Sequence, residues 1–251
     1  MTVPRIAYLS VDVEGDCPPY LDTWRGIEEG IPRLLGMFAE ERAPATFFTT
    51  GEVARRFPGR VADIVAGGHE LGSHGLTHRA FRDMDAAEAE HEINESAAIL
   101  RAFAPVTSFR APYLSFPERY VPLLGQAGFT LDASRAAYKR QEPPYAGPAA
   151  PARLSTSVTS SVLRLPRLIR NPWFGRLAAP VSLFVHPWEF VDFRSSNLRL
   201  DCRFRTGDFA REALRSTIRW FAARGFEFRL AREHAGVGGR SRGAPNPFAD
   251  L

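Results

Sequence analysis

The chain has 251 residues, of which 45% are hydrophobic, and this is enough to bury one large core. Its formal net charge of +4 arises from 32 lysine and arginine residues against 28 acidic ones, and the basic residues form no run or stripe of the kind that binds nucleic acid. The two cysteines, Cys17 and Cys202, lie far apart and outside any Cys-x-x-Cys motif, so we expect neither a disulfide framework nor a cysteine-ligated zinc site.

A strand-like run begins almost at the first residue, and no apolar stretch of signal-peptide length precedes it. No later segment approaches the roughly 20 apolar residues that a membrane span requires. These features predict a soluble protein of the cytoplasm.

Short apolar segments alternate with helical patterns along the chain, which is typical of βα units and a largely parallel sheet or barrel. We predict strands near Arg5–Val11, Ala45–Thr49, Glu70–Ser73, Ser108–Ala111, Phe129–Asp132, Val181–Val185 and Phe226–Leu230. Helices fill the intervals. The clearest are Asp85–Phe103, which begins with a capping-box pattern, and Phe209–Ala223. We expect one α/β domain over residues 1–235.

Three segments depart from this rhythm. Residues 140–161 are rich in Pro, Ala, Ser and Thr, and residues 236–251 have the composition of a disordered tail. Residues Leu163 to Leu177 alternate arginines with large apolar side chains. Two interpretations of this last segment stay open: it lies at an anionic membrane interface, or its apolar residues pack under a long loop while its arginines are solvated.

Polar side chains stand where several of the predicted strands end. In chain order they are Asp12, Glu14, His74, His78, Arg110, Tyr113, Asp132 and His186. The carboxyl ends of parallel strands meet at one face, and α/β barrels and open sheets build their active sites there. We therefore expect these residues to form one site.

Three residues of this set have the donor atoms of a catalytic zinc site. Asp12 and Glu14 are two apart on a strand, so both side chains project to the same face. Glu14, His74 and His78 supply one oxygen and two nitrogen ligands, a set that leaves a position open for water. Asp16 is the rival carboxylate.

The first histidine of this region does not belong to the set. His69 and the glutamate after it resemble the start of a zincin helix, but Ser73 stands where the second histidine would be. Neighbouring glycines disfavour a regular helix, so we expect a loop or a single turn to bring His74 and His78 together.

Four short segments occur in an informative order and spacing. They are SVDVEGD at 10–16, HGLTH at 74–78, RAPY at 110–113 and FVH at 184–186. Together they resemble the motifs of the polysaccharide deacetylase family, the NodB-homology group also called carbohydrate esterase family 4, over most of the chain. The resemblance implies a single-domain, distorted (β/α)7-type barrel.

The resemblance also implies roles for individual residues. Asp12 matches the base of the family, Arg110 the residue that orients the base, and His186 the acid. Val13 separates two acidic residues that are adjacent in the common form of the first motif. The fourth motif is not recognisable, and the segment TLDASR offers Asp132 alone as the residue that tunes the acid.

The implied reaction is the hydrolytic removal of N-acetyl groups from an acetylated amino sugar, with one divalent metal ion, Zn²⁺, as cofactor. We place the backbone N–H of Tyr113 at the oxyanion and Trp188 beside the substrate. The run HPWEF at 186–190 is similar to a subgroup associated with bacterial exopolysaccharide and surface-glycan synthesis. The alternatives are an allantoinase-like amide or cyclic-imide hydrolase on the same scaffold, and a glycan-binding pseudoenzyme.

Overall fold

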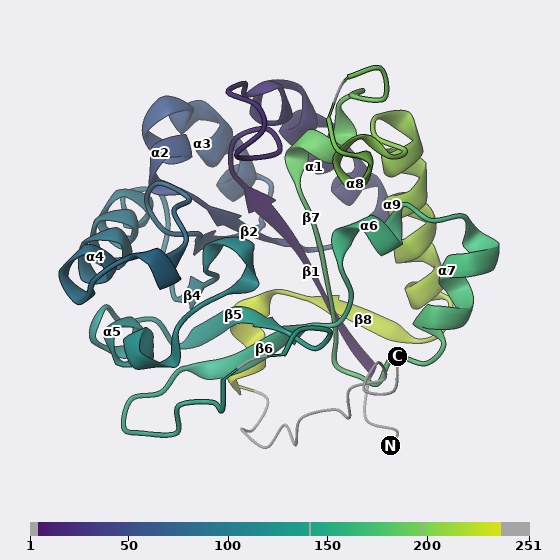
Figure 1. The fold of residues 1–251 in the computed structure, drawn as a ribbon. Helices are drawn as coiled ribbons and strands as arrows, with labels where there is room; N and C mark the ends of the chain where they lie inside the picture. The colour runs from purple at the N-terminus through teal and green to yellow at the C-terminus, as the bar shows by residue number, and fades with distance from the viewer. Residues whose placement is uncertain (1–4, 141, 197, 237–251) are drawn as a thin grey trace.

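A parallel sheet curls into a nearly closed barrel at the centre of the molecule (Figure 1). The computed structural model describes residues 5–140, 142–196 and 198–236. The strands are β1 Arg5–Val13, β2 Thr46–Thr49, β3 Glu70–Ser73, β4 Ser108–Phe109, β5 Leu131–Ala136, β6 Ala152–Thr156, β7 Val181–Val185 and β8 Phe226–Arg229. Their order is β6-β5-β4-β3-β2-β1-β7, and β8 pairs with β1. The predicted single-domain α/β barrel is confirmed.

The barrel closes between the two ends of this strand order. Just after β6, the backbone N–H of Ser157 donates a hydrogen bond to the carbonyl oxygen of Ser182 in β7 (2.8 Å). β7 pairs with residues 7–11 of β1. The other edge of β1 is shared, because β8 pairs with residues 5–8 and β2 with residues 10–13. β1 is therefore the strand around which the sheet is organised.

The side chains of β1 alternate between the inside and the outside of the barrel. The outer set packs under the helices and consists of Ala7, Leu9, Val11 and Val13. Ile6 and Tyr8 pack inside the barrel. Because the period of a strand is two, Asp12 shares the inner face with Tyr8.

Helices cover the outside of the barrel (Figure 1). They are α1 Ile31–Glu41, α2 Gly51–Arg56, α3 Pro58–Ala66, α4 Ala86–Arg101, α5 Val121–Gln126, α6 Ser160–Leu163, α7 Arg167–Phe174, α8 Leu200–Arg203 and α9 Asp208–Ala222. The two helices predicted most clearly are confirmed as α4 and α9. The capping box of α4 is present, since Asp85 and Glu88 each accept a hydrogen bond from the other's backbone N–H. Within the described ranges, no helix has the length and apolar character needed to cross a membrane.

Two expectations about the chain are corrected. The break in the pattern at residues 140–161 contains strand β6, which the composition hides because only two of its five side chains are buried. Cys17 and Cys202 form a disulfide, with Cα atoms 6.5 Å apart, although 185 residues separate them in the sequence. The segments that follow β1 and β7 meet at the same end of the barrel, and spacing alone does not reveal this.

The structure contradicts one of the two interpretations of the segment Leu163 to Leu177, namely that its apolar residues pack under a loop while its arginines are solvated. Its arginines are not all solvated, because Arg164 and Arg170 are buried, whereas Leu168 is 90% exposed. Arg170 donates hydrogen bonds to the backbone carbonyl oxygens of Leu163, the last residue of α6, and of Ala213 within α9. The membrane-interface interpretation stays a prediction. The predicted disordered tail lies, apart from its first residue, outside the described residues.

Close packing at Gly30 connects α1 to the segment that follows β7. A Cβ atom at Gly30 would lie 2.1 Å from the carbonyl oxygen of Pro187. We expect Gly30→Ala to lower the free energy of unfolding by about 1–3 kcal/mol, because a backbone atom cannot move away from the added methyl group. Urea unfolding measures this change.

Gly36, inside α1, provides the control for Gly30, which immediately precedes that helix. A Cβ atom there meets nothing within 4 Å, so Gly36→Ala should raise the free energy of unfolding by up to about 1 kcal/mol through helix propensity. Equal effects of the two substitutions would contradict the close contact at Gly30.

Candidate functional site

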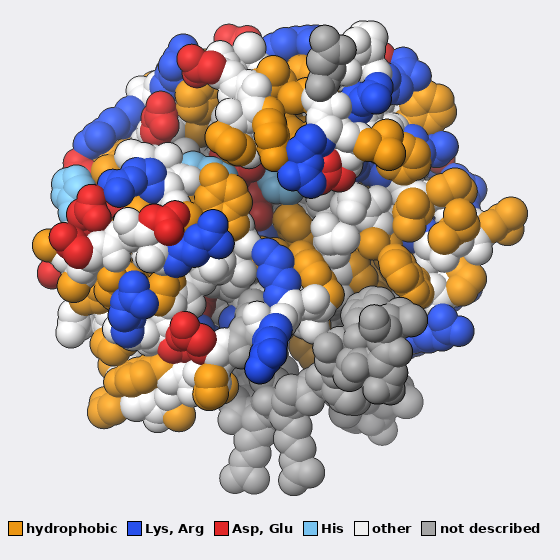
Figure 2. Space-filling model, viewed as in Figure 1, with side chains coloured by type: hydrophobic (Ala, Val, Ile, Leu, Met, Phe, Trp, Pro, Cys, Tyr) orange, Lys and Arg blue, Asp and Glu red, His pale blue; other side chains and the backbone are white. Residues whose placement is uncertain are grey.

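Polar side chains converge where the barrel strands end. In the register of β3 with β4, His74 and Arg110 leave their strands side by side. In the register of β1 with β7, Asp12, near the end of β1, lies beside His186, the first residue after β7. Figure 2 shows histidine and acidic side chains at the floor of a hollow, with hydrophobic and basic side chains around it. These residues therefore lie at one end of the barrel, whereas Asp132, which was predicted to join them, points elsewhere.

Glu14, His74 and His78 form a compact group of ligand atoms. One ligand atom from each residue lies within 4.8 Å of the other two. Oε2 of Glu14 is 3.1 Å from Nε2 of His74 and 2.5 Å from Nε2 of His78. His69 lies elsewhere, where its Nδ1 accepts a hydrogen bond from the backbone N–H of Ala45. The structure thus brings together the three residues that the sequence grouped.

A loop between the two histidines sets their spacing, as predicted. Glu92 of α4, which is buried, accepts hydrogen bonds from the backbone N–H groups of Leu76 and Thr77 and from the Thr77 hydroxyl. Gly75 has a φ of 77°, in the left-handed region that glycine enters without strain. The loop is therefore tied to α4 between the two imidazoles.

The protonation of His74 follows from its partners. Nδ1 of His74 lies 2.7 Å from the carbonyl oxygen of Arg110, and a carbonyl oxygen only accepts, so Nδ1 carries a proton and Nε2 faces Glu14. Burial alone raises the pKa of Glu14, but the charge of His78 and the hydrogen bonds of both histidines hold that pKa well below its usual range. If Nε2 of His74 carries no proton, its lone pair faces the Glu14 carboxylate. That arrangement is unfavourable unless a cation lies between the two atoms. The trio has the form of a cation site.

Asp12 is held by a fully buried arginine. Nη1 of Arg110 is 2.6 Å from Oδ1 of Asp12 and 2.7 Å from Oγ of Ser10. Nε of Arg110 donates to the carbonyl oxygen of Ala133, and the guanidinium lies 4.3 Å from the centre of the Phe48 ring. Because the guanidinium is held from several sides, the Asp12 carboxylate has one preferred orientation.

His186 follows β7 and lies between aromatic rings. Its imidazole stacks on Trp188 with ring centroids 5.0 Å apart, and it meets Phe184 edge-on. Nδ1 is 2.8 Å from Oε1 of Glu189, and Nε2 is 3.9 Å from Oε1 of Glu14. Burial alone lowers the pKa of His186, but the hydrogen bond to Glu189 and the surrounding carboxylates raise it to about 9.

Asp16, the rival metal ligand, is occupied by a turn. Its carboxylate accepts hydrogen bonds from the Thr23 hydroxyl (2.7 Å) and from the backbone N–H groups of Arg25 and Gly26 (2.8 Å each). Gly26 begins the short helix η1, Gly26–Gly30, so Asp16 caps it. Its hydrogen-bond partners in the described ranges include no histidine.

Asp132 does not join the cluster. It is in register with Phe109, whose ring packs in the outer core, so its side chain also points to the outside of the barrel. There the carboxylate pairs with Arg153 and accepts the backbone N–H of Ser134 (2.9 Å). Burial raises the pKa of Asp132, against the opposing effects of Arg153 and Ser134. The structure places the residue away from the acid that it was expected to tune.

Tyr113 lies at the rim of the site. The residue is 44% exposed, and its ring centroid is 4.8 Å from that of His78. Its φ of 61° is uncommon for a residue other than glycine, and such conformations concentrate at functional sites. Nζ of Lys139 donates to the Tyr113 carbonyl oxygen (2.6 Å). Tyr113 is thus both fixed through its backbone and open to a substrate.

Sequence analysis missed two acidic residues near this site. Glu92 stands on the buried face of α4, where a charged residue among apolar neighbours is a signal. Glu189 follows His186 by three residues in the run HPWEF, and this spacing is the signal that could have found it.

Comparison with known proteins finds a matching family model and curated relatives. The family model for polysaccharide deacetylase matches residues 5–131. A peptidoglycan deacetylase from Helicobacter pylori is 35% identical over 119 residues, which cover 45% of this chain and 40% of that protein. A chitooligosaccharide deacetylase from Sinorhizobium fredii is 35% identical over 100 residues, which cover 39% of this chain and 46% of that protein. The chain thus spans less than half the length of both curated relatives.

The barrel is also found in solved structures. The crystal structure of a Mycobacterium smegmatis protein assigned to the polysaccharide deacetylases superposes with a TM-score of 0.70 at 18% identity, and the match covers 94% of this chain and 91% of that one. At this identity the likeness shows the fold alone. The family match over residues 5–131 extends over half of the chain and spans the segments that carry Asp12, Glu14, His74, His78 and Arg110. The chain belongs to the polysaccharide deacetylase family.

Proposed function

We propose that this chain hydrolyses the N-acetyl group of an acetylated amino sugar and that it uses one divalent metal ion, Zn²⁺. The observation that carries the proposal is the convergence of Glu14, His74 and His78 beside the pair formed by Asp12 and Arg110. The names of the two curated relatives support an N-acetylated glycan as the class of substrate. The run HPWEF supports a place in the subgroup associated with exopolysaccharide and surface-glycan synthesis.

The three proposed ligands fit zinc. One carboxylate oxygen and two imidazole nitrogens form the ligand set of catalytic zinc sites that keep a position open. His74 donates its other ring N–H to the carbonyl oxygen of Arg110, as ligating histidines usually do to a fixed acceptor. Bound zinc would supply Lewis acidity toward an amide carbonyl and toward water.

The other residues of the site have proposed roles in moving protons. Asp12, oriented by Arg110, accepts a proton from the attacking water molecule. The backbone N–H of Tyr113 donates to the amide oxygen as negative charge develops on it. His186 gives a proton to the leaving nitrogen while the C–N bond breaks, so that acetate and a free amine are formed. We assign Asp132 to the pairing of β5 with β6.

Removing a member of the trio should remove the metal. We expect His74→Ala, His78→Ala and Glu14→Gln to lower bound zinc from one ion per chain to almost none, because two ligands hold zinc far more weakly than three. Inductively coupled plasma mass spectrometry after dialysis against buffered zinc measures the content.

The controls for metal binding are Asp16→Asn and His91→Ala. Asp16 accepts three hydrogen bonds in its turn, and His91 is exposed on α4, so both variants should retain the ion. Retention of zinc by Glu14→Gln together with its loss from Asp16→Asn would transfer the carboxylate role to Asp16.

The variant Asp12→Asn should separate metal binding from turnover. Asparagine keeps an oxygen that faces Arg110 but cannot take a proton at neutral pH, so acetate release from N-acetylated chitotetraose should fall about 10²- to 10⁴-fold while zinc stays bound. Asp192→Asn is the control, since Asp192 is an exposed partner of Arg194, and its turnover should be unchanged. Full acetate release by Asp12→Asn would place the base elsewhere, and no release by the unaltered protein would overturn the proposed activity.

A further inference from the structure

His186 has two ring nitrogens, and one of them must face the reacting atoms. The rings of Trp188 and Phe184 restrict the plane of the imidazole but do not distinguish its two edges. The contact with Glu189 distinguishes the two edges, because Nδ1 lies 2.8 Å from Oε1 of Glu189 while Nε2 is directed toward Glu14. An ionised carboxylate only accepts hydrogen bonds, so Nδ1 carries a proton. Glu189 therefore selects the edge of the ring that reaches the site.

Glu189 is a buried carboxylate with a fixed position. Its side chain is 1% exposed, and Oε2 lies 2.9 Å from Nε of Arg164. Burial alone raises the pKa of Glu189, but Arg164 and His186 lower it below its ordinary value. Oε1 also accepts the backbone N–H of His186 (3.0 Å). The carboxylate thus binds both the backbone and the ring of the histidine.

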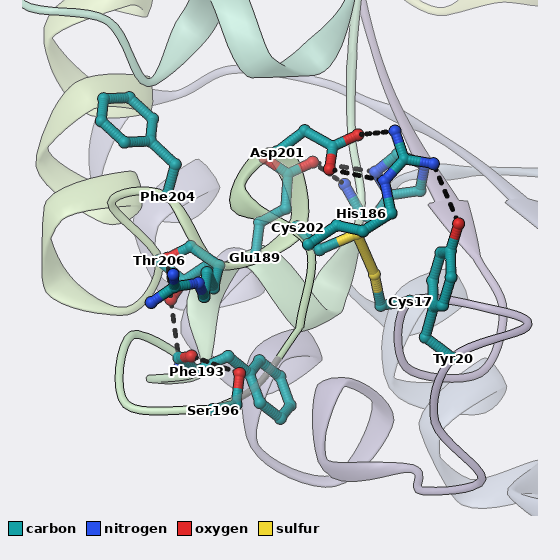
Figure 3. Close-up of a disulfide and its surroundings, with 12 residues drawn as sticks. Cys17, Tyr20, His186, Glu189, Phe193, Ser196, Asp201, Cys202, Phe204 and Thr206 are labelled. Carbon is teal, nitrogen blue, oxygen red and sulfur yellow. Dashed lines mark hydrogen bonds and ion pairs between the residues drawn. A yellow bond between two sulfur atoms is a disulfide. The ribbon is translucent and has the colours of Figure 1, made fainter.

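Arg164 is anchored in turn by the backbone. Its two terminal nitrogens donate to the carbonyl oxygens of Asp201, Cys202 and Phe204, in and after α8. Figure 3 shows Cys202 near Glu189 and His186, with its disulfide to Cys17. Arg164 is 2% exposed, so its guanidinium has no room to leave Glu189.

Stability alone does not explain a pair of this kind. Desolvation of two buried charges offsets much of their attraction, and replacing buried ion pairs by apolar residues of similar volume is often neutral or stabilising in proteins. The pair stands beside His186. The family resemblance predicted that Asp132 tunes the acid. Asp132 is instead bound to Arg153 on the outside of the barrel.

We infer that Glu189, backed by Arg164, is the positioning residue that holds His186 with Nδ1–H on the carboxylate and Nε2 toward the substrate. The inference rests on the proposed deacetylase function, in which His186 is the acid. In that step the proton on Nε2 passes to the sugar nitrogen as the C–N bond breaks. The proton on Nδ1 stays between the ring and Glu189, so Glu189 exchanges no proton with the substrate.

A double-variant cycle with zinc-loaded protein and N-acetylated chitotetraose tests the inference. Glu189→Gln keeps the shape and an acceptor oxygen but removes the charge, so we expect kcat to fall at least about 10-fold while KM and zinc content stay unchanged. In a His186→Ala background the same substitution should change kcat by less than about 2-fold, because Glu189 acts through His186. The inference would be overturned if the fold-loss of kcat in the double variant equalled the product of the two single-variant losses. An unchanged kcat in Glu189→Gln would also overturn it.

Glu118→Gln is the matched control for the loss of a buried charge. Glu118 is a largely buried carboxylate that pairs with Arg135 and Arg153, outside the network of His186. We expect its kcat to equal that of the unaltered protein. A loss as large as that in Glu189→Gln would count against a specific role for Glu189.

The orientation of His186 can also be read without turnover. In zinc-loaded protein with ¹⁵N-labelled histidine, long-range ¹H–¹⁵N spectra identify the protonated ring nitrogens, and the His186 signal is the one absent from His186→Ala. We expect a slowly exchanging Nδ1–H. A ring protonated at Nε2 alone would overturn the inference even if acetate is released. Protonated Nδ1 without any acetate release would overturn the proposed function and support the assigned orientation.

Discussion

One buried guanidinium connects the two chemical halves of this site. The side chain of Arg110 holds Asp12, while its backbone carbonyl oxygen accepts the Nδ1–H of His74. Both contacts depend on the short strand β4, which lets Arg110 leave the sheet beside the point where His74 leaves β3. A buried guanidinium without an anionic partner would be strongly unfavourable, so the barrel can hold Arg110 only together with Asp12. Residue 110 therefore couples the proposed base to the proposed metal ligands.

The parts of this site that depend on strand ends could be predicted from the sequence. β3 and β7 have the bounds that their short apolar runs predicted, and His74 and His186 follow them directly. Alternation along β1 was enough to place Asp12 on the inner face, because the period of a strand does not depend on its neighbours, and Glu14 follows the last residue of that strand. Local pattern thus predicted most of the barrel and the grouping of Glu14, His74 and His78.

Contacts that depend on the register or on distant loops could not be predicted. Asp132 stands near the end of the sheet, but its parity with Phe109 turns it outward, and that parity is visible only when β4 and β5 are paired. Asp16 was the rival of Glu14 as the carboxylate ligand, and the donors of its turn cannot be read from the sequence. Cys17 and Cys202 come together because β1 and β7, the strands that they follow, pair side by side. Each of these outcomes follows from hydrogen-bond capacity or topology, which residue spacing does not record.

The partner of His186 is supplied by the same short segment as His186 itself. In the 3₁₀ turn Pro187–Phe190, side chains three residues apart lie above one another, so Glu189 returns to His186 without help from another strand. An aspartate on β5 would need the opposite parity to reach the inside of the barrel. Asp132 is free instead to bind Arg153, and it joins β5 to β6, the strand that the sequence pattern concealed. The orientation of His186 thus depends on a local turn and on Arg164, and not on the register of β5.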